Sequence, residues 1–159
     1  MSPASTSTAR RRPPDEPAAG QASLMVATGA EGLAPMRDGL AARLASEGWD
    51  AREAHRVLLA ATEALANAIE HGSQPGDPVV VGFSADARRA RVVVLDRGAG
   101  PVVPRGTTLP PPEAPRGRGL VLMGAFADEM SVERPGGTLV RLAFHRREEM
   151  SGAAMAPPR

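Results

Sequence analysis

The sequence predicts an α/β (α+β) sandwich in which helices pack on one face of a mainly antiparallel, mixed sheet. Three observations support this fold class. Segments with apolar residues at helical spacing alternate with short runs rich in β-branched residues. Two pairs of these β-rich runs are joined by short turn-forming connections, as in hairpins. The resulting order, β-α-α-β-β-loop-α-β-β, is typical of a layered domain with one core.

The length of 159 residues fits one domain with tails. We expect a disordered N-terminal tail over residues 1–20, which are rich in Pro, Ser and Thr. The folded domain should span 21–146, followed by a flexible C-terminal tail over 147–159. The basic run Arg10-Arg11-Arg12 lies within the first tail, and we interpret it as solvated.

The first half of the domain should contain one strand and two helices. The run "ASLMVAT", residues 22–28, is β-rich, and residues 33–48 repeat Met36, Leu40 and Leu44 at helical spacing before ending at Gly48. Asp50 then resembles the N-cap of a long helix that runs to His71-Gly72. Glu53, three residues after Asp50, completes a capping-box-like pattern.

The second half should contain two hairpins around a long loop and a helix. Residues 78–86 and 89–98 form the first pair of β-rich runs. Residues 101–116 carry six prolines and are too irregular for a regular element, which is typical of functional or disordered loops. A helix over 118–128 precedes the second hairpin, 129–134 and 138–144, which turns at Pro-Gly-Gly.

Composition excludes several kinds of chemistry. The formal charge is only +1, so we expect no direct nucleic-acid partner, and no apolar run is long enough for a membrane span or a signal peptide. We therefore expect a cytoplasmic protein. The absence of Cys excludes disulfides, thiolate zinc sites and cysteine nucleophiles. All 19 basic residues are Arg, and the absence of Lys excludes a P-loop, an ordinary protein-kinase lysine and a Schiff base.

The long helix carries polar groups at a four-residue spacing, Glu63, Asn67 and His71. At about 100° per residue these three lie along one stripe, away from the apolar face. Asn67 can offer a neutral amide oxygen to Mg²⁺, and Glu63 a carboxylate that accepts a proton. For His71 two roles stay open: capping the helix end, or contacting phosphate or the lid.

Two glycine-containing motifs follow at strand and helix ends. In "DRGAG", residues 96–100, Asp96 would accept from an exocyclic amine, while Gly98 and Gly100 let the backbone approach a planar ligand. In "GRGL", residues 117–120, the start of a helix would expose N–H groups suited to phosphates.

The order and spacing of these motifs resemble the N, G1 and G2 boxes of the GHKL ATPases, which have the Bergerat fold. "GGT" at 136–138 resembles the segment that completes their adenine pocket. Within that superfamily the chain is similar to the bacterial anti-sigma factor serine-protein kinases over residues 22–145. The resemblance rests on "EALANAIEHG", "LDRGAGP", "GRGLVLM…FADEM" and "GGTLVRL", and above all on Glu63 four residues before Asn67.

The resemblance implies a domain that binds ATP with Mg²⁺, sequesters an alternative sigma factor and phosphorylates a serine of a STAS-type anti-anti-sigma partner. Asn67 would ligand Mg²⁺, Asp96 would accept from the adenine amine, and Glu63 would take the proton from the attacking serine. The other implied nucleotide-binding residues are His71, Gly98, Gly100, Gly117, Arg118, Gly119, Leu120 and Thr138. Arg105 and Arg118 are candidates for the γ-phosphate, the 101–116 loop would be the ATP lid, and a homodimer is possible.

Two alternative functions remain. The lid is short and proline-heavy, and Arg116 stands where family members often have a small residue, which leaves open a nucleotide-gated regulator-binding module without kinase activity. A detached ATPase domain of a sensor histidine kinase would need a helical hairpin with a phosphorylatable His. We expect no such hairpin here and interpret His55 as a solvated residue.

Overall fold

The computed structural model describes residues 22–72, 74–98, 118–134 and 136–147, and it confirms the expected fold class. Its α-helices are α1 (Leu33–Ser46), α2 (Ala51–Asn67) and α3 (Arg118–Phe126). Its strands are β1 (Ser23–Ala27), β2 (Val79–Ala85), β3 (Arg89–Asp96), β4 (Glu129–Glu133) and β5 (Thr138–His145). A short 3-10 turn, η1 (Ala30–Gly32), precedes α1.

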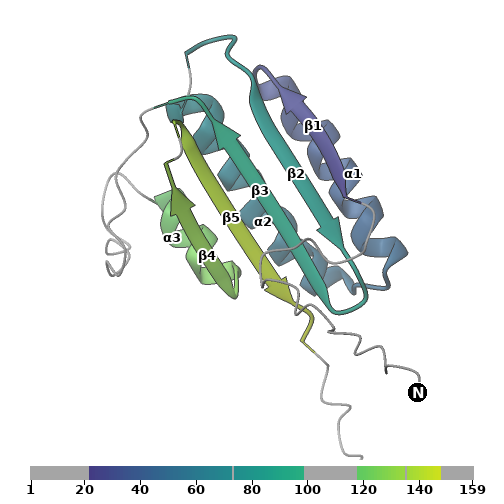
Figure 1. Cartoon of the computed structure of the whole chain (residues 1–159). Coiled ribbons are helices and arrows are strands. Elements are labelled where there is room, and N and C mark those ends of the chain that lie inside the picture. Colours follow the sequence, from purple (N-terminus) through teal and green to yellow (C-terminus); the bar gives the residue numbers. More distant parts are fainter. Residues whose placement is uncertain (1–21, 73, 99–117, 135, 148–159) are drawn as a thin grey trace, which may run out of the picture.

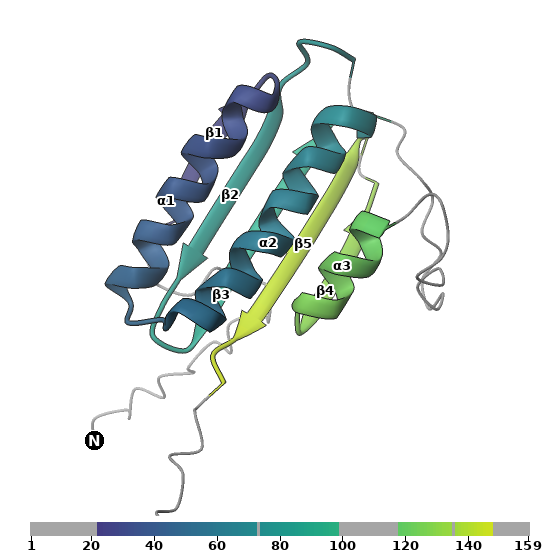
Figure 2. The ribbon, with the colours of Figure 1, turned by 180° about the vertical axis from the view of Figure 1, so that it is seen from behind.

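The strands form one sheet in the order β1-β2-β3-β5-β4, and each of the described pairings is antiparallel. The hairpins predicted from sequence, β2-β3 and β4-β5, are both present. All three α-helices lie on the same face of this sheet, as the two opposite views show (Figures 1 and 2). Because β3 and β5 pair directly, with Asp96 opposite Thr138, the end of β3 and the start of β5 meet beside the helix layer.

Local sequence signals set the ends of the first two helices. Asp50 caps α2, and its Oδ1 accepts from the backbone N–H groups of Arg52 and Glu53, each at 2.9 Å. An N-cap of this kind stabilises a helix by about 1 kcal/mol. Gly48 ends α1 with a φ of 76°, a left-handed conformation that glycine adopts without steric cost.

The capping box expected from Glu53 is not formed. Among the hydrogen bonds of the described residues, Glu53 Oε2 accepts from Arg56 Nε and from one of its terminal nitrogens, at 3.1 and 2.9 Å. Its side chain is buried together with that of Arg56, so the carboxylate serves a buried ion pair instead of the helix N-terminus. The sequence pattern S/T/D-x-x-E is compatible with either arrangement.

The long helix also ends differently from the prediction. It is α-helical only to Asn67 and continues as a π turn, η2 (Ala68–Gly72). A π turn holds an extra residue per turn, so the residues after Asn67 rotate away from their α-helical positions. The stripe expected to include His71 is therefore interrupted after Asn67.

The hydrophobic core fills the space between the helices and the sheet. Its fully buried large side chains are Met36, Leu40, Leu44, Val57, Leu65, Val79, Val81, Val92, Val94, Met123, Leu142 and Phe144. Each such apolar side chain contributes about 1.5–3 kcal/mol through burial. No helix in the described part of the chain is long and apolar enough to cross a membrane.

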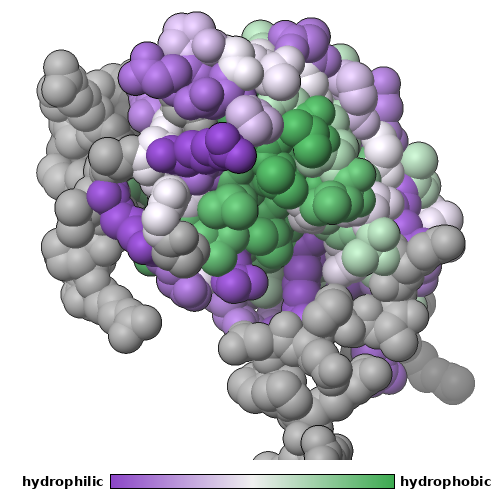
Figure 3. All heavy atoms as spheres, turned by 45° about the horizontal axis from the view of Figure 1, so that its top comes forward, coloured by the Kyte–Doolittle hydropathy of each residue, from purple (hydrophilic) through white to green (hydrophobic). Residues whose placement is uncertain are grey.

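The other face of the sheet is divided into an apolar and a charged part. Leu24, Val26 and Leu95 are exposed, Leu24 to 75%, and strand register aligns Val26 with Val80 and Val80 with Leu95. Hydrophobic side chains gather into one patch in the space-filling view (Figure 3). Arg89 and Arg141 lie farther along the same face, where they pair with glutamates of β4.

Candidate functional site

A buried carboxylate stands at the end of the central strand β3. Asp96 is on the helix-covered side of the sheet and is only 5% exposed. Its Oδ1 accepts from the backbone N–H groups of Gly98, at 2.8 Å, and Thr138, at 3.3 Å. Both bonds reach the same oxygen, and Oδ2 accepts no hydrogen bond from a residue that the structure describes. This oxygen is therefore suited to a donor supplied by a ligand.

The predicted neighbours of Asp96 are brought to it by the sheet and by close backbone packing. Asp96 and Thr138 are register partners in β3 and β5, and Thr138 Oγ1 donates to the carbonyl of Gly98 at 3.4 Å. A Cβ at Gly98 would overlap the carbonyl of Gly72, and one at Gly137 would overlap the carbonyl of Asp96. Glycine is therefore required at positions 98 and 137, because any side chain there would collide with the neighbouring backbone.

Asn67 and Glu63 lie one turn apart on α2, and both are half-buried. Neither side chain makes a hydrogen bond to another residue of the described segments. The first turn of α3 packs directly on Asn67, because a Cβ at Gly119 would lie well under 3.0 Å from the amide nitrogen Nδ2. The next residue, Leu120, is partly buried against the hydrophobic core. The amide of Asn67, which has no hydrogen-bond partner among the described residues, is thus held beside the start of a helix.

His71 lies apart from this group. It is in the π turn, its side chain is 68% exposed, and Nε2 lies 3.7 Å from Glu70 Oε2. The structure thus gives no contact of His71 with the other described candidate residues. Gly100, Arg105 and Gly117 fall outside the described residues, and so does the side chain of Arg118. Their predicted roles stay predictions.

Sequence reasoning missed two residues of the site, Gly72 and Gly137. Gly72 follows the amphipathic helix and was interpreted only as its end, a common position for glycine. Gly137 was quoted within "GGT", but only Thr138 received a role. Both pack on Asp96, a contact that depends on how β3, β5 and the helix end meet in three dimensions.

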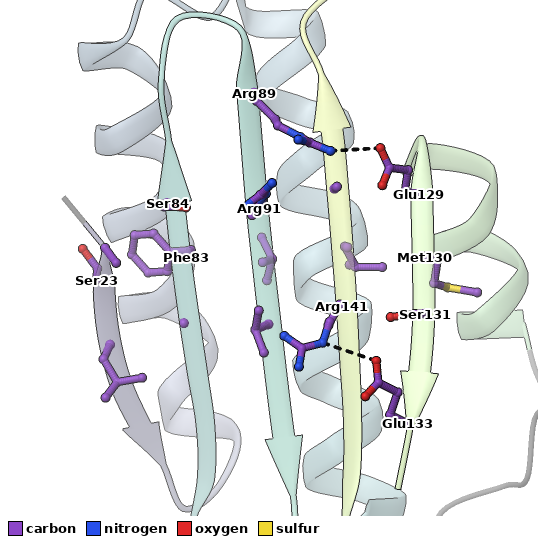
Figure 4. A pocket seen from close by; sticks show the side chains of 17 residues that line it. Ser23, Phe83, Ser84, Arg89, Arg91, Glu129, Met130, Ser131, Glu133 and Arg141 are labelled. Atoms are coloured by element: carbon purple, nitrogen blue, oxygen red, sulfur yellow. Dashed lines mark hydrogen bonds and ion pairs between the residues drawn. The ribbon is translucent and has the colours of Figure 1, made fainter. Parts of the chain in front are cut away.

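A separate hollow on the helix-free face carries a different set of groups. It is lined by Ser84, Ser131 and charged side chains of β3, β4 and β5 (Figure 4). There Arg89 pairs with Glu129 at 3.0 Å, and Arg141 pairs with Glu133 at 3.5 Å. Asp96 lies on the opposite side of the sheet. We therefore place the candidate site at the helix-covered end of β3.

The groups at this end fit a purine nucleotide with its metal ion. A buried carboxylate with an available oxygen can accept from an exocyclic amine, and glycines beside it allow a planar base to approach. The amide oxygen of Asn67 is an acceptable Mg²⁺ ligand, and a helix N-terminus beside it favours phosphate. The fold and these groups together are those expected of a nucleotide-binding domain.

The comparison with family models gives this class its name. The chain belongs to the histidine kinase-like ATPase domain family, whose model matches residues 26–144. Its fold is similar to a solved structure described as the crystal structure of the RsbU and RsbW domains of Rv1364c from Mycobacterium tuberculosis. The TM-score is 0.57 and the sequence identity 21%, and the match covers 79% of this chain and 33% of that chain. The likeness to that structure shows the fold alone. No curated protein matches the sequence.

Proposed function

We propose that this chain is an ATP-binding anti-sigma factor and serine-protein kinase. It would bind ATP with Mg²⁺, sequester an alternative sigma factor and phosphorylate a serine of a STAS-type anti-anti-sigma partner. The proposal combines membership of the histidine kinase-like ATPase family with the sequence resemblance of the boxes around Asn67, Asp96 and Gly119. The likeness to a structure that includes an RsbW domain supports the same choice at the level of the fold.

The nucleotide would be held from both ends. Asp96 Oδ2 would accept from the adenine amine, with Gly98, Gly100 and Thr138 shaping the pocket around the base. The phosphates would meet the start of α3, where Gly117, Arg118, Gly119 and Leu120 stand. Arg105 of the lid and Arg118 would be the candidates for the γ-phosphate, and His71 would either cap the helix end or contact phosphate or the lid. Asn67 would ligand Mg²⁺, which supplies charge neutralisation of the phosphates when bound.

The proposed kinase activity depends on Glu63 as the base that accepts the serine proton. It lies one helical turn before Asn67, is half-buried, and accepts no hydrogen bond from the described residues. Phosphoryl transfer depends mainly on positioning and electrostatics, together with a base that can accept the proton of the attacking hydroxyl. A carboxylate that no residue of the described segments pairs with, one turn from the amide proposed to bind the metal, is suited to that task.

The substitution Glu63→Gln tests the assignment. We expect ATP affinity within about twofold of wild type, because the proposal gives Glu63 no part in holding the nucleotide, and phosphoryl transfer lowered about 10²–10⁴-fold. Transfer is measured from labelled ATP to the STAS-domain protein encoded nearest to this chain's gene. Glu133→Gln, an exposed glutamate of β4 on the helix-free face, is the matched control.

The outcomes of this experiment separate the candidate functions. Wild-type transfer by the Glu63→Gln variant would remove Glu63 as the base. A wild-type protein that binds its partner in Mg-ATP but transfers no phosphate would be the regulator-binding module without kinase activity. Acid-stable, base-labile phosphate on the partner indicates serine and excludes phosphohistidine.

A further inference from the structure

Gly72, at the end of the π turn, contacts the carboxylate of Asp96. Gly72 is buried, and a Cβ added to it would lie well under 3.0 Å from both Oδ2 and Cγ of Asp96. The carbonyl of Gly72 in turn contacts Gly98 so closely that Gly98 has no room for a side chain. The end of the helix is therefore packed against the end of β3 with no side chain from Gly72 between them.

The backbone conformation does not require glycine at this position. The glycines with positive φ in the described residues are Gly48, Gly76 and Gly136. Gly76 has open space around its Cα, whereas Gly72 has an ordinary φ and a crowded neighbour. The contact with Asp96 is thus the reason that a side chain does not fit at 72.

Asp96 cannot easily move away from such a side chain. Its Oδ1 is held by two backbone N–H groups, its side chain has only two rotatable bonds, and it is buried. A methyl group at position 72 would therefore turn or push the carboxylate from its present orientation. The three atoms nearest to a Cβ at Gly72 all belong to the side chain of Asp96.

We propose that Gly72 and the π turn position Asp96 and thereby set the base selectivity of the nucleotide site. The inference rests on the proposed ATP site and adds Gly72 to it as a positioning residue. A correctly oriented carboxylate accepts from the 6-amino group of adenine but repels the 6-oxo group of hypoxanthine, since both are then acceptors. A displaced carboxylate loses this discrimination, while the phosphate-binding part is retained.

The ratio of the dissociation constants for ITP and ATP tests the proposal in the whole chain. We expect wild type to prefer ATP at least tenfold, and Gly72→Ala and Asp96→Asn both to lower this ratio toward one. The ITP affinity should change less than about threefold in either variant. Gly82→Ala is the control, because its added Cβ would meet only ordinary contacts from 3.8 Å on the helix-free face.

Two results would overturn the proposal in different ways. A folded Gly72→Ala protein with the wild-type ratio would show that Gly72 does not position Asp96. A wild-type protein that binds neither nucleotide would overturn the proposed function and the selectivity role together. Circular dichroism of each variant shows which proteins are folded.

A stability measurement keeps the inference testable without any nucleotide. Urea unfolding is compared for wild type, Gly72→Ala, Asp96→Ala and the double variant. Because the double variant lacks the carboxylate that the new methyl group would meet, Gly72→Ala should lower the urea midpoint less than half as much there. If Gly72→Ala alone fails to fold, the double variant should fold. An equal loss in both backgrounds would contradict a role that acts through Asp96.

Discussion

At the start of α3, Gly119 leaves room for the side chain of Asn67 and for little else. A Cβ at 119 would fall well under 3.0 Å from Nδ2 and about 3.0 Å from Cγ and Oδ1 of Asn67. The residue is in the first turn of a helix, where alanine is ordinarily favoured over glycine by about 1 kcal/mol. The contact with Asn67 therefore opposes the intrinsic preference of the helix.

Gly119→Ala should separate these two effects. We expect helix propensity to limit any loss in unfolding free energy, while ATP affinity falls about tenfold, equivalent to about 1.4 kcal/mol, because the amide must shift. Calorimetric titration and urea unfolding measure the two quantities on the same protein. Wild-type ATP affinity in this variant would show that the position of Asn67 does not govern nucleotide binding.

The proximity of some candidate residues could be predicted from the sequence motifs, and their roles stay predictions. Asp96 and Thr138 lie side by side, and Gly98 contacts both, as the motifs suggested. Gly72 could not be assigned a contact, because its neighbour Asp96 is 24 positions away in sequence and the π turn that ends at Gly72 has no simple periodic signature.

At the level of elements, a buried arginine joins the helix layer to the sheet. Arg56 of α2 is 7% exposed and donates to Glu53, to Asp128, and to the carbonyls of Phe126 and His145. Burial alone would lower the pKa of Arg56, but its bonds and charge interactions with Glu53 and Asp128 outweigh that effect and raise it. The guanidinium thus ties α2 to the end of α3 and to the end of β5.

Asp128 gives this network a pH dependence. Burial raises the pKa of Asp128, but the N–H of His145 and the guanidinium of Arg56 outweigh it and lower the pKa below its ordinary value near 3.8. Because the folded-state pKa is depressed, the stabilisation is present above about pH 4 and is lost as the pH falls through the lower folded-state value.

The substitution Asp128→Asn tests that dependence. We expect unfolding free energy at pH 7 to fall by about 1.5–3 kcal/mol, the usual range for hydrogen bonds to charged groups, and the decline below pH 4 to become shallower. Urea unfolding at pH 7 and pH 3 measures both. Glu133→Gln is the control, since its exposed pair with Arg141 contributes no more than about 1 kcal/mol. An unchanged acid limb in Asp128→Asn would contradict the account.

The helices and strands were largely predictable from sequence, but the order of the strands in the sheet and the long-range contacts of their side chains were not. Apolar periodicity located the helices and strands, and Asp50 and Gly48 marked helix ends as expected. The position of β5 between β3 and β4 does not follow from local patterns, because it depends on pairing across the whole domain. Glu53 was misassigned to a cap for the same reason: its partner Arg56 is fixed by distant carbonyls.

At the scale of the whole molecule, the two faces of the sheet carry different kinds of surface. The helix-covered side carries the candidate nucleotide site at the end of β3, and the other side carries the apolar patch and the paired charges of Figures 3 and 4. Exposed apolar patches are common at protein interfaces. The homodimer expected from sequence stays a prediction.

The most direct test of the central claim is calorimetric titration of ATP, with and without Mg²⁺, into the wild-type protein beside Asn67→Ala and Asp96→Asn. We expect micromolar, Mg²⁺-dependent binding worth about 8 kcal/mol in the wild type. The Asn67→Ala variant should lose the Mg²⁺ dependence and Asp96→Asn the base contact, so both should bind more weakly. Absence of binding, or equal affinity in all three proteins, would contradict a nucleotide site at the end of β3.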